Sequence, residues 1–303
     1  MFAAELIASS LRMAIPILLA ALGGVYTERA GVVNIGLEGM MIVGSFWGAL
    51  GSYFYGPLGG FALAMTAGLF LALIHAVATV TFRVDQVVSG VALNILAYGS
   101  SRFLSQAIFQ KASTSPHVQG LAPINIPLPD GSFLKPLLTG FSPVIILAVL
   151  LVPVSNYIIY RTVFGLRLRS VGEKPLAADT LGINVFKMKY AGVLISGLLA
   201  GLAGAYLALE HTGMYVEGMT QGKGFIALAA VIFGNWTPGG AFWASLLFGF
   251  AESLSFRVVE GGVIPYQFIK MIPYVLTLVV LTGVVRKSTA PAADGVPYDR
   301  SSG

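Results

Sequence analysis

Long apolar segments, separated by short polar or helix-breaking stretches, set the pattern of this chain. A helix needs about 20 mainly apolar residues to cross the hydrocarbon core of a bilayer. Segments of that kind occur at residues 6–25, 32–55, 59–81, 86–108, 139–160, 188–209, 239–257 and 264–285. The pattern therefore predicts an all-α fold, a polytopic transmembrane helical bundle with about eight full spans.

Helix-breaking residues predict two interruptions in this bundle. The sequence Tyr55-Gly56-Pro57-Leu58-Gly59-Gly60 separates two apolar segments, and Glu38 is the only charge between Val32 and Phe82, so we expect a helical hairpin with its turn here. The apolar segment Gly224–Trp236 is too short to span a bilayer and is followed by Thr237-Pro238-Gly239-Gly240. We expect it to form a short or broken helix that pairs with the next span.

Glycine is common for a helical protein, with 37 residues, and several glycines recur at the spacing of one helix face. Small residues at that spacing let helix backbones approach closely in lipid. We therefore expect tight helix packing at Gly44 and Gly48, and at Gly197, Gly201 and Gly204.

Composition and charge support the membrane assignment. Hydrophobic residues make up 56% of the chain and charged residues only 10%, against about 25% charged residues in an ordinary soluble protein. The net charge of +5 comes from basic residues in loops, which favours contact with membrane lipid head groups and not with nucleic acid.

The distribution of Lys and Arg predicts the orientation of the chain. Residues 161–189 carry six basic residues against Glu173 and Asp179, which places this loop in the cytoplasm. Counting spans backwards places the N-terminus and the loop 109–138 outside, and residues 210–223 outside as well. We assign residues 1–288 to one transmembrane domain and 289–303 to a disordered cytoplasmic tail, because that tail is short and polar.

The chain lacks the motifs of an enzyme. The nearest match to a phosphate-binding loop, Gly218–Gly224, has the wrong spacing and no Ser or Thr after Lys223. Cysteine is absent and the three histidines are scattered. We therefore expect no catalytic residues, no metal site and no cofactor in this subunit.

The loop 161–189 holds a candidate docking helix. Pro175 suits a first helical turn, residues 176–181 form a short helical stretch with small residues on one side, and Gly182 ends it. A short helix of this kind fits a cleft on another protein, and a plain linker is the alternative.

These stretches carry a resemblance to a known family. Gly172–Ile183 resembles the coupling-helix loop of ABC importer permeases of the branched-chain amino acid, ribose and nucleoside group. Glu28–Met41, Gln86–Asn94 and Gly222–Trp236 are also similar to the family, in family order over nearly the whole chain. The second and last of these four stretches most resemble nucleoside permeases that work with a basic-membrane-lipoprotein type receptor.

The resemblance implies the function and the partners. The chain would be a multi-pass permease of a prokaryotic cell (inner) membrane that moves nucleosides and hydrolyses no ATP itself. Its partners would be a second, longer permease, a cytoplasmic ATPase that uses the ATP, and an extracytoplasmic solute-binding lipoprotein. Related permeases carry simple sugars or branched-chain amino acids. The residues that couple to the ATPase would be Gly172, Glu173, Ala177, Ala178, Asp179 and Gly182.

Polar residues within the spans are the candidates for a solute pathway. Such residues are expensive in lipid unless they face a cavity or a partner. The candidates are Asn34, Glu38, Ser89, Asn94 and Glu252, whose amide, hydroxyl and carboxylate groups can bond to a nucleoside. The alternative is that they bond helices to one another. An ion-coupled carrier that uses Glu38 and Glu252 is a second alternative, but it leaves the loop 161–189 unexplained.

Overall fold

The computed structural model describes residues 2–124, 140–260, 271 and 289–299, and over these residues the fold is helical with no β-strand beyond isolated bridges. In chain order the elements are α1 (Phe2–Arg29), α2 (Leu37–Ala76) with the π-helix η1 (Val77–Thr81), α3 (Gln86–Phe109), α5 (Pro143–Arg161), α6 (Val163–Glu173), α7 (Pro175–Thr180), α8 (Val185–Tyr206) with the π-helix η2 (Leu207–His211), α9 (Lys223–Phe233) and α10 (Pro238–Glu260).

Among the described residues, five helical segments are long and apolar enough to cross a membrane: Ala4–Arg29, Leu37–Thr81, Gln86–Phe109, Pro143–Arg161 and Val185–His211. The predicted number of eight full spans is therefore not confirmed. Two predicted spans, 32–55 and 59–81, fall within the single segment Leu37–Thr81. The predicted span 239–257 lies in α10, which is not among these five segments, and 264–285 lies outside the described residues.

The segment Leu37–Thr81 folds back on itself, as predicted for a hairpin. Gly56 interrupts α2 with a non-helical conformation (φ 75°, ψ 178°). The two halves then touch, since a Cβ atom added to Gly60 would lie 2.7 Å from the carbonyl oxygen of Gly48. Gly56 supplies the positive φ that a side chain would disfavour, and the halves run antiparallel.

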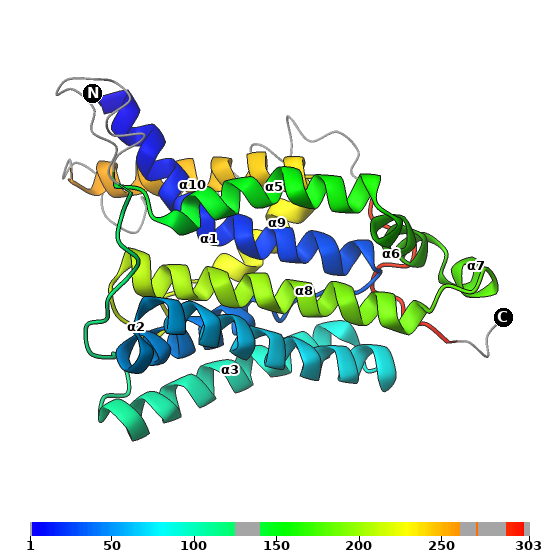
Figure 1. Ribbon diagram of the computed structural model, residues 1–303, viewed down its shortest axis with the longest axis horizontal. Coiled ribbons are helices and arrows are strands. Elements are labelled where there is room, and N and C mark those ends of the chain that lie inside the picture. Colours follow the sequence, from blue (N-terminus) through cyan, green and yellow to red (C-terminus); the bar gives the residue numbers. More distant parts are fainter. Residues whose placement is uncertain (1, 125–139, 261–270, 272–288, 300–303) are drawn as a thin grey trace.

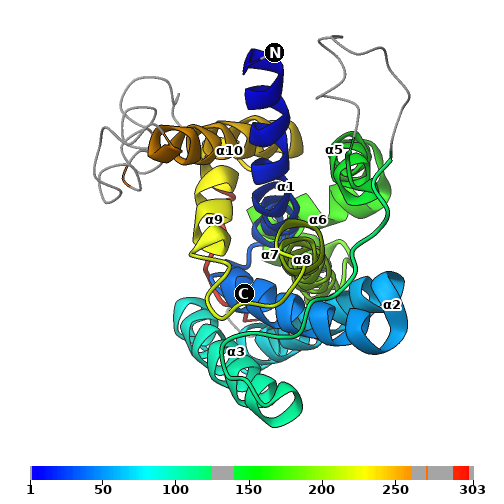
Figure 2. The ribbon, with the colours of Figure 1, turned by 90° about the vertical axis from the view of Figure 1, so that its left-hand side faces the viewer.

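Helix α8 lies at the centre of the bundle, between α1 and the α2 hairpin (Figures 1 and 2). Glycines allow both halves of the hairpin to reach it. A Cβ atom on Gly44 would lie 2.5 Å from the Gly201 oxygen, and one on Gly68 would lie 2.2 Å from the Gly197 oxygen. The predicted close packing at Gly44 and Gly201 is confirmed, because no side chain fits at such distances.

The helices run between two ends of the molecule. The N-terminus lies at one end, and α6, α7 and the C-terminus lie at the other, which we call the α7 end (Figure 1). Residues 289–299, which belong to the predicted disordered tail 289–303, lie at the α7 end and contact α6, α7 and α8.

Two interruptions occur in the helices of the bundle. The predicted span 32–55 begins too early, because residues 31–36 are not helical and α2 starts only at Leu37. The predicted short helix at 224–236 is confirmed as α9, which ends at Phe233, five positions before α10 begins at Pro238. The two interruptions lie next to each other, and the candidate site is built around them.

Candidate functional site

The segment between α1 and α2 runs through the bundle interior in an irregular conformation, and only its Ala30, Gly31 and Val32 amides bond back to the last turn of α1. Ala30, Val32 and Asn34 are almost fully buried. An unsatisfied backbone group in a membrane interior costs several kcal/mol, so irregular backbone survives there only where other groups bond to it. The segment therefore needs partners from neighbouring helices.

Side chains from α2, α3 and α8 supply those partners. They bond to the backbone as follows: Gly31 O with Lys189 Nζ (2.8 Å), Val33 N with Gln86 Oε1 (2.6 Å), Val33 O with His75 Nε2 (3.3 Å) and Ile35 O with Asn94 Nδ2 (3.1 Å). Asn94 also accepts from the Gly39 amide (2.7 Å), and so it joins the interruption to the first turn of α2.

The interruption reaches well into the bundle. The Asn34 amide donates to Ser196 Oγ (2.7 Å), about three turns into α8 from the α7 end. Asn94 lies about two turns into α3 from the same end. Since a bilayer core is about 30 Å thick, these depths place the start of α2 near its middle.

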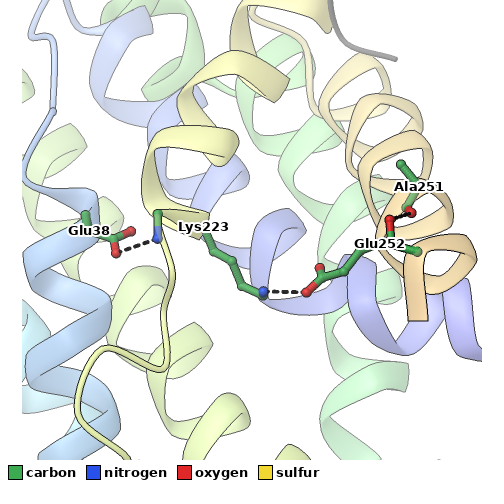
Figure 3. Close-up of polar contacts among 6 residues, drawn as sticks. Glu38, Lys223, Ala251 and Glu252 are labelled. Carbon is green, nitrogen blue, oxygen red and sulfur yellow. Dashed lines mark hydrogen bonds and ion pairs between the residues drawn. The ribbon is translucent and has the colours of Figure 1, made fainter. Parts of the chain in front are cut away.

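The N-terminus of α9 meets the start of α2 at this depth. The Glu38 carboxylate accepts hydrogen bonds from Thr220 Oγ1 (2.6 Å) and Gly222 N (3.0 Å). It also accepts one from Gly224 N (2.7 Å), at the start of α9 (Figure 3). The first amides of a helix lack partners within the helix, and the helix dipole favours a negative charge beside them. Glu38 therefore caps α9 from a different helix.

Lys223 carries the connection on to α10. Its Nζ lies 2.7 Å from Oε1 of Glu252, and Lys223 is only 7% exposed (Figure 3). The two charges neutralise each other where an unpaired charge would be costly. A continuous series of polar contacts thus runs from α2 through α9 to α10.

Ser89 completes the arrangement on the α3 side. Its Oγ lies 2.9 Å from Nδ1 of His75, whose other ring nitrogen lies 3.3 Å from the Val33 carbonyl. Both side chains are buried. Ser89 therefore acts on the interruption through His75.

The residues predicted for a solute pathway are thus joined, through the two interruptions, into one set of polar contacts that we call the polar layer: Asn34, Glu38, Ser89, Asn94 and Glu252, with the additional members His75, Gln86, Ser196, Thr220 and Lys223. Sequence reasoning missed the additional members. The charges of residues 210–223 predict an outer loop that includes Lys223, whereas the structure buries this residue.

The polar layer is nearly saturated with internal hydrogen bonds. Both Glu38 oxygens and both polar atoms of Asn94 have protein partners, whereas the buried Oδ1 of Asn34 has none. No group of three or more His, Cys, Asp or Glu residues that could hold a metal occurs among the described residues. The layer can therefore join helices, and it can offer polar groups to a solute only when those bonds open.

The α7 end holds the residues predicted to couple to an ATPase. Helix α7 forms where predicted, with Pro175 in its first turn. Its two faces differ: Ala178 is buried (2% exposed), whereas Leu176 (42%) and Leu181 (82%) are exposed, as is Ala177. The apolar surface available to another protein therefore consists of Leu176 and Leu181 and does not include Ala178.

The end of α6, which belongs to the predicted coupling residues, lies against the start of the first interruption. At the end of α6, a Cβ atom on Gly172 would lie 2.2 Å from the Arg29 carbonyl oxygen, so the two backbones touch. Arg29 Nε also donates to the Trp236 carbonyl (2.8 Å), and the Trp236 indole bonds to the buried Glu28 carboxylate. A displacement of α6 and α7 thus acts directly on the ends of α1 and α9.

Comparison with known proteins identifies the family. A family model for the permease component of branched-chain amino acid transport systems matches residues 6–281. The chain belongs to this permease family. No solved structure gives a significant match.

The most similar relatives agree with this assignment. The chain is 46% identical to the guanosine ABC transporter permease protein NupQ of Bacillus subtilis, over 97% of this chain and 96% of the relative. It is 41% identical to the nucleoside ABC transporter permease protein NupC of Lactococcus lactis, over 98% and 97%. A putative glucose ABC transporter permease, TsgC13 of Haloferax volcanii, is 38% identical over 84% and 78%.

A more distant relative comes from the same organism as NupQ. The guanosine ABC transporter permease protein NupP of Bacillus subtilis is 28% identical, in a match that covers 90% of this chain but only 80% of NupP. NupP is therefore a longer homologue. The relatives named here are permeases of ABC transporters, and this chain is likewise a multi-pass membrane protein of the permease type.

Proposed function

We propose that this chain is the permease subunit of an ABC importer that carries nucleosides across the inner membrane of a prokaryotic cell. The observation that carries the proposal is the identity of 46% and 41%, over nearly full length, to permeases named for guanosine and nucleoside transport. The short helix α7, with exposed apolar residues at the end of the bundle, supports a subunit moved by a partner.

The partners follow from the kind of system. A second permease, longer than this chain, would complete the solute path, as the existence of both NupQ and NupP suggests. A cytoplasmic ATPase would bind α7 and hydrolyse ATP, and an extracytoplasmic lipoprotein would deliver the solute. This subunit would then need neither a cofactor nor a catalytic residue.

The geometry supports a mechanism based on the two interruptions. Movement of α7 would pass through Gly172 to Arg29 and from there to residues 30–36 and to α9. The polar layer would then exchange some of its internal bonds for bonds to the passing solute. Asn34, with its unpartnered Oδ1, is the first group that we expect to do so. Bonds of this kind are weak enough to release the solute again.

The solute is tested by uptake in cells that lack their own nucleoside transporters. Co-expression of this chain with its partners should give uptake of labelled guanosine that excess unlabelled adenosine or uridine reduces. The glucose permease name of one relative provides the competing outcome. Absence of guanosine uptake, together with uptake of labelled glucose, would assign the importer to sugars instead.

The docking role of α7 is tested separately at Leu181. Leu181→Arg places a charge on the exposed apolar surface, and we expect loss of ATP-driven uptake with normal membrane insertion. Val163→Arg, at a residue of α6 that is 64% exposed, is the matched control and should retain uptake. Ala178 is unsuitable for this test, because an arginine there would disrupt buried packing. Full uptake by Leu181→Arg would exclude the docking role.

A further inference from the structure

The chain segment 289–299 lies against the α7 end along its whole length. Its backbone and side chains form hydrogen bonds and an ion pair with distant parts of the chain: Thr289 N with Asn235 Oδ1 (3.1 Å), Ala292 N with Glu173 Oε2 (3.2 Å), Ala293 N with Gly172 O (2.9 Å), Tyr298 Oη with Asp179 Oδ2 (3.0 Å) and Asp299 Oδ2 with Arg83 Nη1 (2.6 Å). These partners lie at four places: the connection between α9 and α10, the end of α6, α7, and the connection between η1 and α3. The segment therefore links parts of the α7 end that the bundle itself leaves apart.

Tyr298 is the apolar anchor of this segment. It is only 6% exposed and forms a small core with the buried residues Val171, Ala178 and Val185. Its ring meets the ring of Phe186 edge to face, with centroids 5.6 Å apart. An aromatic contact of this kind adds to the packing energy. Tyr298 therefore ties α6, α7 and the start of α8 together.

Ala293 and Asp294 connect the same segment to the first interruption. Ala293 is buried, and a Cβ atom on Gly31 would lie 3.0 Å from its carbonyl oxygen. The Asp294 carboxyl group is largely buried, and burial raises its pKa to about 7 in spite of the opposing effect of Lys189. Lys189 also bonds to the Gly31 carbonyl (2.8 Å).

The position of residues 289–299 decides whether they block the docking of a partner on α7 or leave it open. A segment that inhibits docking would cover the outer face of α7. Here it contacts the inner face, at Ala178 and Asp179, and leaves Leu176 and Leu181 exposed. A partner can therefore reach α7 while the segment stays in place.

We propose that residues 289–299 form a strut that holds α7 rigidly to residues 31–33, so that movement of α7 is transmitted to the interruption in the bundle. Tyr298 is the principal positioning residue of this strut, with its ring fixed by packing and its hydroxyl bonded to Asp179. The strut remains attached throughout the transport cycle. The proposal rests on the proposed function, because it assumes that a partner moves α7.

Cysteine cross-linking tests whether the strut stays attached. The chain has no cysteine of its own, so engineered ones are the only thiols it carries. Arg83→Cys and Asp299→Cys place two thiols at positions whose native side chains form an ion pair (2.6 Å) and are partly exposed. In the assembled importer, a bifunctional thiol reagent about as long as the two lost side chains should join them equally well with and without ATP. Cross-linked importer should retain its ATP-dependent uptake, as should the Asp299→Cys single control.

Removal of the strut tests its contribution to coupling. Truncation before Thr289 should raise the number of ATP molecules hydrolysed per solute transported, while insertion and assembly stay normal. Tyr298→Phe keeps the packing and removes only the bond to Asp179, and so should raise that ratio about threefold to tenfold, the effect of one hydrogen bond. Val296→Ala, at an exposed position of the same segment, should leave it unchanged.

Three results would overturn the proposal that residues 289–299 act as a strut. One is loss of uptake on cross-linking, which would mean that the segment must detach. Another is higher uptake after truncation, which would make it an inhibitor. The third is an unchanged ratio in both the truncated and the Tyr298→Phe importers. If the unmodified importer shows no ATP-dependent uptake, the proposed function fails, whereas ATP-independent cross-linking would still establish that the segment stays attached.

Discussion

Replacement of Glu38 by alanine is the sharpest perturbation of the polar layer. The Glu38 carboxylate accepts hydrogen bonds from the Gly222 and Gly224 amides at the start of α9 and from the Thr220 hydroxyl. In Glu38→Ala the hydroxyl can turn to another acceptor, but the two amides cannot. Each polar group left unsatisfied in a buried site costs about 1–3 kcal/mol. We expect a loss of about 2–6 kcal/mol in the free energy of unfolding, and a smaller loss for Glu38→Gln, which keeps one acceptor oxygen.

The assay is the midpoint of chemical denaturation of the purified chain in detergent. Gln106→Ala, an exposed polar residue of α3, is the control and should unfold like the unmodified chain. Denaturation midpoints for Glu38→Ala and Glu38→Gln that match the control would refute the capping role. If uptake were lost in those variants at unchanged stability, Glu38 would act on the solute instead of on α9.

Three further predictions concern the helix contacts, the ion pair and the strut. Gly224→Ala should destabilise the chain and abolish uptake, because its Cβ would lie 2.4 Å from the Glu38 amide nitrogen, whereas Gly99→Ala, with open space around it, should be neutral in both assays. Lys223→Met and Glu252→Gln should each lower stability more than the double variant does, because a single change leaves unpaired either the partly buried Glu252 charge or the buried Lys223 charge. Equal or additive losses in denaturation midpoints would contradict this. The raised pKa of Asp294 means that attachment of the strut is strongest below about pH 4 and weakens as pH rises toward 7, since the charged form is disfavoured when buried. The rate of carboxypeptidase digestion of the chain, divided at each pH by the rate for a free peptide of residues 289–303, should therefore be higher at pH 8 than at pH 6. Asp294→Asn should remove the difference.

The long apolar segments allowed much of the bundle to be predicted. The predicted span 86–108 corresponds to α3 at Gln86–Phe109, and the span 139–160 overlaps α5 at Pro143–Arg161. The breaker sequence around Gly56 located the hairpin turn. These features depend on residues that are neighbours in the sequence, and so the sequence alone indicates them.

The start of α2 could not be predicted in the same way. Val32 and Val33 are as apolar as the helix that follows, so they extend the hydrophobic pattern. They stay non-helical because Val33 bonds to Gln86 and His75, and the following Ile35 bonds to Asn94, in place of helical hydrogen bonds. Those side chains are distant in sequence, and only the folded chain brings them to the interruption.

Lys223 and Tyr298 were missed for a related reason. A lysine between two glycines resembles a loop residue, and its partner Glu252 lies on another helix. The segment around Tyr298 has too few apolar residues to indicate a packed structure, and much of its attachment uses backbone groups, such as the bond from Ala293 to Gly172. Composition gives no signal for attachment of that kind.

The division of labour between a passive bundle and a separate motor is tested most directly in liposomes. This chain would be reconstituted with the longer permease, the ATPase and the binding lipoprotein, and accumulation of labelled guanosine would be followed. We predict accumulation against a gradient only when all four proteins and ATP are present. Accumulation against a gradient by this chain alone, without nucleotide, would contradict the account.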